Sequence, residues 1–265
     1  MTTVALAVTA AWPRELDGGV RPVLVEADAG GGDLAARFRT AHSPGLLDVA
    51  ASAHRDRPGT VLGAVQELPV GVRAVLAPAG ARQCAEAIRA IGSSSGEVLA
   101  GGDGEHGTVL LDAGRIQPGS AVGLADEVVL LSRGGVEALS HVYAYTELLG
   151  EEDAKELTLV VVGPCPYREA EILQTLKVGR VVFLPWDPRS AEALAGCQEL
   201  PARRRGRRVW PLMKAAEQLA YLLAGGVPSS GQLAPALAES VQAPALGAAE
   251  RVALTAPVHG GGDMS

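Results

Sequence analysis

The sequence predicts an α/β protein with three layers, α/β/α, around a mostly parallel sheet. Two observations lead to this fold class. Short apolar runs alternate repeatedly with helical patterns along the chain, which is the rhythm of strand–helix–strand units. Several of these runs are apolar throughout, as expected of strands that helices cover on both faces. With 265 residues, 48% of them hydrophobic, the chain can bury a full core, and we expect one α/β domain over residues 1–225.

Charge and cysteine content limit the function classes. The net charge of −7 excludes wholesale coating of nucleic acid, although it leaves room for a local basic patch. The three cysteines, Cys84, Cys165 and Cys197, are far apart and have neither metal-site nor disulfide spacing. Apolar runs stay below the roughly 18 residues of a membrane span, and a basic-then-apolar signal peptide is missing. We therefore expect a cytoplasmic protein without a transmembrane segment.

The first segment, MTTVALAVTAAWP, allows two interpretations. Its alanines are good helix formers and Pro13 would end a helix. Residues 3–9 are also β-branched enough to form a strand, with residues 10–19 as a decayed loop. We favour the helix. In either case a glycine-rich loop with a lysine does not precede the next strand, and such loops are what hold nucleotide phosphates.

Residues 20–38, VRPVLVEADAGGGDLAARF, join an apolar strand to Glu26 and Asp28, then to three glycines and a helix that begins after Asp33. In doubly wound α/β proteins a ligand site lies at such a strand end. The alternative is an acidic strand end with Asp33 as the helix cap. Both interpretations stay open on these residues alone.

A second acid-tipped strand is predicted at residues 107–115, GTVLLDAGR. Four apolar residues lead to Asp112, in the form of a Walker B strand whose carboxylate holds the water shell of magnesium. Many buried strands end in Asp, so the motif needs support from its context. Between the two acid-tipped strands we expect a buried strand over residues 71–78 and a helix over residues 81–91.

The second half of the chain continues the strand–helix alternation. Strands are expected within residues 125–133, 158–163 and 180–185, each followed by a helix. Asp187 is expected to cap the helix after the third of these strands. A last helix covers residues 210–224, and the Gly/Pro/Ala-rich residues 226–265 are predicted to be a flexible tail.

One basic run, ARRRGRR, precedes the last helix. It could contact DNA phosphates or an acidic partner, or it could be a solvated loop. The arginines concerned are Arg203, Arg204, Arg205, Arg207 and Arg208.

Three motifs resemble the ParA/MinD family of deviant P-loop ATPases. VLVEADAGGGDLA resembles the family's second strand, VLLVDADPxGGDLA; VLLDAGR resembles its VVVDLGR or VLVDCGR strand; and LPWD resembles its LPxD loop. The resemblance spans roughly residues 1–224 in consistent order. It is nearest to the MinD-like and TadZ/CpaE-like proteins of high-GC bacteria.

The resemblance implies a P-loop NTPase-like fold, ATP and Mg²⁺ as cofactors, and a homodimer. The implied function is spatial organisation, as an ATPase or degenerate ATPase that positions chromosomes, division sites or pilus and secretion machinery, with a protein partner at the cell pole or in a pilus or partition system. The implied site residues are Asp28 to orient the attacking water, Thr2 and Asp112 for magnesium, and Thr2, Thr3, Gly31, Pro185 and Asp187 for the nucleotide.

The sequence also departs from the family. Thr2 and Thr3 match the two threonines of the phosphate loop, but Met1 stands where its lysine should be, so that the first strand and nearly the whole loop are absent or altered. Glu26 replaces an Asp, and Gly163 with Pro164 replaces an adenine-reading Asn. Either the protein is a degenerate member, such as a non-catalytic TadZ/CpaE-like scaffold, or its true start lies upstream. Loss of a central strand would strip both neighbours of ladder partners, which favours the second explanation.

Overall fold

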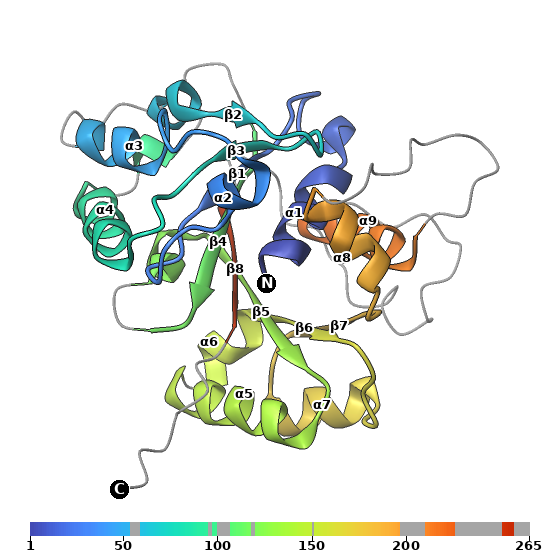
Figure 1. Ribbon diagram of the computed structural model, residues 1–265. Coiled ribbons are helices and arrows are strands. Elements are labelled where there is room, and N and C mark those ends of the chain that lie inside the picture. The colour runs from blue at the N-terminus through green and yellow to red at the C-terminus, as the bar shows by residue number, and fades with distance from the viewer. Residues whose placement is uncertain are drawn as a thin grey trace, which may run out of the picture.

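The protein is built around one sheet that has helices on both faces (Figure 1). The structure, a computed structural model, describes residues 1–53, 59–94, 97–99, 107–117, 120–149, 151–196, 210–225 and 251–256. The strand order is β2-β3-β1-β4-β8-β5-β6-β7, and every pairing is parallel except that of β2 with β3. This confirms the predicted fold class. The strands are β1 (Val23–Glu26), β2 (Gln66–Glu67), β3 (Arg73–Val75), β4 (Val109–Arg115), β5 (Glu127–Arg133), β6 (Thr158–Val162), β7 (Arg180–Leu184) and β8 (Arg251–Ala256).

The helices form two outer layers. One face of the sheet packs against α1, α8 and α9, and the other packs against α3 and α4 at one end and α5 to α7 at the other (Figure 1). The α-helices are α1 (Thr2–Ala11), α2 (Leu34–Phe38), α3 (Leu46–Ser52), α4 (Ala81–Ser93), α5 (Val136–Leu149), α6 (Glu151–Glu156), α7 (Glu169–Leu176), α8 (Pro188–Leu194) and α9 (Pro211–Leu223). Short 3₁₀ turns are η1 (Arg14–Leu16), η3 (Thr60–Ala64), η4 (Glu97–Leu99) and η5 (Ala121–Leu124).

The first segment is a helix, as favoured, and the strand interpretation of residues 3–9 is wrong. Six consecutive residues of α1, from Val4 to Thr9, are buried, so this helix is enclosed rather than lying on the surface. It packs between the sheet and α9, in a core that includes Leu24 and Leu110. The helix ends just before Trp12 and Pro13, as the proline predicts. Its N-terminus points toward the carboxyl ends of the strands, which decides where Thr2 and Thr3 lie.

Alternate residues of each central strand enter different cores. Leu24 and Leu110 contact the layer of α1 and α9, whereas Val25 and Leu111 contact the layer of α3 and α4. This is the period of two that a strand covered on both faces requires. The sheet thereby fixes the strand ends, and with them the acids that follow β1 and lie within β4.

Strand β8 lies in the middle of the sheet, between β4 and β5, and is parallel to both. The prediction that residues 226–265 form a flexible tail is therefore wrong for Arg251–Ala256; the rest of that tail lies outside the described residues. The segment RVALTA contains the β-branched residues that favour strands, and it supplies ladder partners that β4 and β5 would otherwise lack. The central position of the sheet is thus filled from the C-terminal end of the chain.

Two sequence expectations concern the cell compartment. In the part of the chain that the structure describes, no helix is long and apolar enough to cross a membrane. Cys84 and Cys165 are free thiols, whereas Cys197 lies outside the described residues.

Candidate functional site

The acid-tipped strands β1 and β4 are neighbours, and their acids meet at the carboxyl edge of the sheet. Glu26 is in register with Asp112, and the backbone N–H of Ala27 donates to the Asp112 carbonyl at 2.9 Å. The two motifs that the sequence separates are therefore one site, at the edge where open α/β sheets bind ligands.

Glu26 has a structural role at this edge. It is 2% exposed, and its Oε1 accepts hydrogen bonds from the backbone N–H groups of Asp33 at 2.6 Å and Leu34 at 2.9 Å. Its Oε2 accepts one from the Ala77 N–H at 2.9 Å. Asp33 occupies the N-cap position of α2 but makes no side-chain cap hydrogen bond. The alternative interpretation, in which the Asp33 side chain caps this helix, is therefore wrong: Glu26 accepts from these amides and also links the helix to the segment after β3.

Burial raises the pKa of Glu26, and the three backbone hydrogen bonds oppose that shift. The space around its carboxylate is closed. A β-carbon built on Gly32 would lie 2.5 Å from Oε2 of Glu26 and 2.6 Å from the Ala77 carbonyl oxygen. The glycine at this point of the triple-glycine run is therefore needed for close packing around the acid.

Asp28 follows β1 and reaches across to β4. Its Oδ1 accepts a hydrogen bond from the Gly30 N–H at 2.7 Å, while Oδ2 has no hydrogen-bond donor among the described residues. A β-carbon built on Gly114 would lie 2.1 Å from Cγ of Asp28, so the carboxylate occupies the space that a side chain at this position of β4 would take. Asp28 is held in place and keeps one oxygen available to a ligand or a water.

Asp112 is 2% exposed, as Glu26 is, and its Oδ1 has no hydrogen-bond partner in the described part of the chain. Burial raises its pKa; the hydrogen bond with the Thr2 side chain opposes that rise, and the nearby Asp28 charge adds to it. A buried carboxylate oxygen without a partner is costly unless a cation or a donor satisfies it.

The residues present fit a magnesium ion. Among the described residues no group of three or more His, Cys, Asp or Glu side chains could form a cage for a metal. Mg²⁺ does not need such a cage, since it keeps several waters and uses one or two protein oxygens together with substrate phosphates. Thr2 and Asp112, a hydroxyl and a carboxylate already in contact, are an oxygen pair of this kind.

Positive groups lie at the Met1 end of the site. Burial lowers the pKa of the Met1 amino group, the Asp112 charge opposes this effect, and the charges of Arg37 and Arg133 reinforce it. Asp112, Arg37 and Arg133 therefore each lie within electrostatic reach of the Met1 amino group. Nη1 of Arg37 is buried and without a hydrogen-bond partner among the described residues. An anionic ligand would be stabilised in these surroundings.

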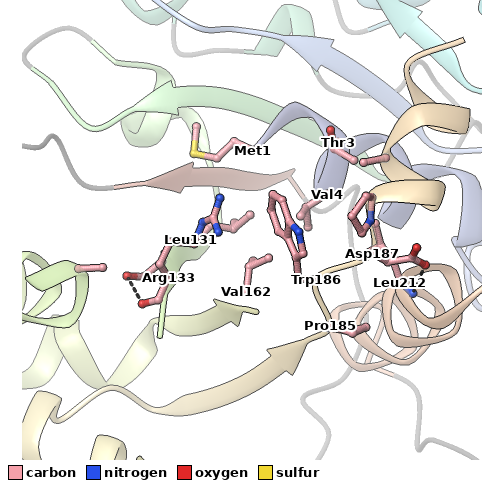
Figure 2. Close-up of a pocket in the computed structure, with 14 residues that line it drawn as sticks. Met1, Thr3, Val4, Leu131, Arg133, Val162, Pro185, Trp186, Asp187 and Leu212 are labelled. Carbon is pink, nitrogen blue, oxygen red and sulfur yellow. Dashed lines mark hydrogen bonds between the residues drawn. The ribbon is translucent and has the colours of Figure 1, made fainter. Parts of the chain in front are cut away.

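Beside the acids lies a pocket of about 360 Å³ (Figure 2). The N-terminus of α1 forms one wall, the end of β5 a second, and the segment after β7 a third. Its lining is mostly apolar, with Trp186 as the single aromatic side chain among the described lining residues. The guanidinium carbon of Arg133 lies 4.3 Å from the centroid of the Trp186 ring. The size and the mixture of apolar walls with few polar groups are typical of small-molecule sites.

Asp187 shapes the third wall of this pocket by capping α8, as predicted. Its Oδ1 accepts from the Ser190 N–H at 3.2 Å, and its Oδ2 accepts from the Ser190 hydroxyl at 2.5 Å and from the Leu212 N–H at 3.3 Å. Burial would raise the pKa of Asp187, but these hydrogen bonds lower it overall. The carboxylate also joins the start of α8 to the start of α9.

The structure gathers most of the predicted site residues. Thr3, Pro185 and Asp187 line the pocket. Thr2, Asp28 and Asp112 form the acidic group beside it, through the contacts given above. Gly31 does not line the pocket; its φ is +111° and a β-carbon there would lie 2.4 Å from the Ala79 carbonyl oxygen.

Other residues were predicted elsewhere or missed. The arginines of the basic run, residues 203–208, lie outside the described residues. Sequence reasoning missed Trp186 and Arg133 as partners. A signal was available for Trp186, because a large aromatic residue between Pro185 and Asp187 at a strand end has no core position to fill.

Comparison with known proteins supports the fold. No protein-family model matches this chain, and no curated protein matches it. Among solved structures, a ParA family ATPase from Chlorobium tepidum has a TM-score of 0.55 at 15% identity, over 83% of this chain and 91% of that one. A chain of the MinC:MinD cell division protein complex from Aquifex aeolicus has a TM-score of 0.58 at 16% identity, over 88% and 94%. The septum site-determining protein MinD from Pyrococcus horikoshii, complexed with Mg-ADP, has a TM-score of 0.56 at 14% identity, over 83% and 90%. This chain therefore has the fold of the ParA and MinD proteins.

Proposed function

We propose that the protein binds ATP with Mg²⁺ at the carboxyl edge of its sheet, as a ParA/MinD-like ATPase or degenerate ATPase for spatial organisation. The observation that carries this proposal is the state of Asp112. This carboxylate is buried, has an oxygen without a partner, contacts Thr2 and lies beside a second acid. The adjacent pocket offers room for a base, and the fold neighbours include a ParA family ATPase and a MinD complexed with Mg-ADP.

Each residue of the site has a separate role in this proposal. Thr2 and Asp112 would hold Mg²⁺, which supplies charge neutralisation for the phosphates when bound. Oδ2 of Asp28 would accept a hydrogen bond from the attacking water and orient it, while the Gly30 N–H donates to the other carboxylate oxygen. Arg37 and Arg133 supply positive charge beside the phosphates. Pro185 and Trp186 provide apolar surface for the base.

A second candidate is a non-catalytic localisation scaffold of the TadZ/CpaE kind. The observation that favours it is the charge of the pocket walls: the described lining residues include Arg133 but no lysine. Such a protein would use the same fold to bind partners without hydrolysis.

Calorimetric titration with ATP, with and without Mg²⁺, tests the proposal. We expect magnesium-dependent binding that Asp112→Asn abolishes and that Asp28→Asn leaves within a few-fold, since only Asp112 would contact the metal. Wild-type protein that binds no ATP would overturn the proposal. Phosphate release then separates the two candidates, because an ATPase releases phosphate and loses this activity in Asp28→Asn, whereas a scaffold releases none.

The proposal extends to partners. A homodimer and a protein partner at a division site, partition complex or pilus would fit the fold, since one fold neighbour is a MinC:MinD complex. Contact with DNA through Arg203–Arg208 remains a separate part of the proposal. It predicts binding that weakens steeply with salt and that alanines at these positions abolish. Binding that is unchanged in the alanine variant would remove DNA from the function.

A further inference from the structure

Arg133 and Trp186 meet over the pocket from two different strands. Arg133 ends β5, and Trp186 follows β7 on the other side of β6. Figure 2 shows the arginine side chain reaching toward the indole, with its guanidinium carbon 4.3 Å from the ring centroid. Both side chains are exposed, Trp186 by 57%. The contact is a cation–π pair at the pocket wall, where a ligand can reach both groups.

The ring of Trp186 is the obvious surface for a planar ligand in this pocket. It is the single aromatic ring among the described lining residues, and bases stack on such rings whatever their hydrogen-bonding pattern. The guanidinium of Arg133 covers the ring at stacking distance. A base cannot stack on the covered face until Arg133 moves.

Arg133 is free to move because no acid holds it. In the part of the chain that the structure describes, the Trp186 ring is the single partner of its guanidinium. The other charged residue of the pocket lining, Asp187, already accepts three hydrogen bonds from Ser190 and Leu212. An exposed cation–π contact contributes only modestly, so the guanidinium can leave the ring when a stronger partner arrives.

That partner would lie on the side of the acids. Arg133 lines the pocket together with Met1, and Met1 is followed directly by Thr2, the proposed magnesium ligand, so a ligand on the Trp186 ring could extend its phosphates toward that end of the pocket. Guanidinium groups pair with phosphate oxygens through two parallel hydrogen bonds, which are stronger than a contact with a ring face.

We propose that Arg133 is an exchangeable cover of Trp186: a nucleobase takes the place of the guanidinium on the indole ring, and the guanidinium turns to the phosphates of the same ligand. This inference rests on the proposed nucleotide site. It adds a coupling between the two halves of the ligand. A nucleoside must displace the guanidinium from the ring without offering it an anionic partner. A nucleotide displaces the guanidinium and also provides phosphate oxygens to which it can bind.

Isothermal titration of the full chain with ADP–Mg²⁺ and, separately, with adenosine tests the exchange. Arg133→Gln should weaken ADP binding by about tenfold, because a charge-assisted phosphate contact is lost. The same variant should tighten adenosine binding severalfold, because the ring is no longer covered. Arg133→Lys retains the charge and should keep ADP binding within a few-fold. Arg82→Gln, at an exposed arginine of α4, is the matched control and should change neither affinity.

Tryptophan fluorescence gives an independent readout. ADP should change the emission of the wild-type protein, and Trp186→Phe should lose this change while a thermal melt shows that it is folded. Equal weakening of ADP and adenosine by Arg133→Gln, or no change in either, would overturn the exchange while leaving the nucleotide site standing. If the wild-type protein binds neither ligand, both the proposed function and the exchange are wrong.

Discussion

The carboxylate of Asp28 occupies the place where Gly114 would carry a side chain. A β-carbon on Gly114 would lie 2.3 Å from each carboxylate oxygen of Asp28. Asp28 belongs to the segment after β1 and Gly114 to β4, so this contact joins the two acid-tipped strands into one site. The backbone of Gly114, with a φ of +67°, is also in a region that favours glycine.

We therefore expect Gly114→Ala to be destabilising and to displace Asp28. The loss should be about 1–3 kcal/mol in the free energy of unfolding, from the strained φ and the contact with the carboxylate. Urea denaturation measures it. Gly123→Ala is the control, because nothing lies within 4 Å of a β-carbon there. Equal stability of the two variants would show that Asp28 does not lie where we describe it.

Asp112→Asn should stabilise the protein at neutral pH while abolishing magnesium-dependent ATP binding. Burial raises the pKa of Asp112 in the folded state, so the folded protein holds the proton more tightly than the unfolded chain does. This acid's contribution to stability is then fully present below the unfolded pKa of about 3.9 and is lost as pH rises through the higher folded pKa. The amide cannot ionise and avoids this loss.

Unfolding free energies measured from pH 4 to pH 8 check this sign. Stability of the wild-type protein should fall relative to Asp112→Asn across that range. The exposed Asp153→Asn is the matched control and should follow the wild type. A difference between wild type and Asp112→Asn that stays constant with pH would contradict the expected linkage.

Glu26→Gln should weaken the fold around the acid-tipped strand. The two carboxylate oxygens of Glu26 accept from the Leu34 and Ala77 N–H groups separately. A glutamine side chain has only one acceptor oxygen, so one of these N–H groups would lose its acceptor. We expect a loss of about 1–3 kcal/mol, the cost of a buried unsatisfied group. Thermal unfolding of this variant beside the exposed Glu86→Gln separates the buried role from a general loss of charge. If the melting temperature of Glu26→Gln equals that of Glu86→Gln, the buried hydrogen bonds of Glu26 do not stabilise the fold.

Deletion of residues 226–265 should loosen the centre of the sheet. Both β4 and β5 pair with β8, and its removal exposes their ladder groups to solvent. Hydrogen–deuterium exchange should be faster in β4 and β5 of the shortened chain, whereas the edge pair of β2 and β3 should be unaffected. Unchanged protection of β4 and β5 would mean that β8 does not stabilise the sheet.

Local sequence patterns predicted the features that depend on local chemistry. The alanine-rich α1, the acid-tipped strands and the Asp187 cap each follow from residues close in sequence, and the structure contains all three. The position of a strand in the sheet does not follow from local residues. Strand β8 is a short run within a Gly/Pro/Ala-rich stretch, and it is a strand because β4 and β5 lie on either side of it.

Long-range partners explain the other omissions. Glu26 accepts a hydrogen bond from Ala77, which follows the neighbouring strand β3, and Arg133 contacts Trp186 on the other side of β6. Residue spacing carries no information about either contact. The chemistry of each residue was visible in the sequence, but its partner was not.

The hydrogen bond from the Leu212 N–H to Asp187 has a consequence for the arginine-rich run between them. The helix that precedes the run, α8, and the helix that follows it, α9, both begin at the Asp187 carboxylate, which lies in the pocket wall. A displacement of Asp187 by a ligand entering the pocket would therefore be transmitted to the first turns of both helices at once.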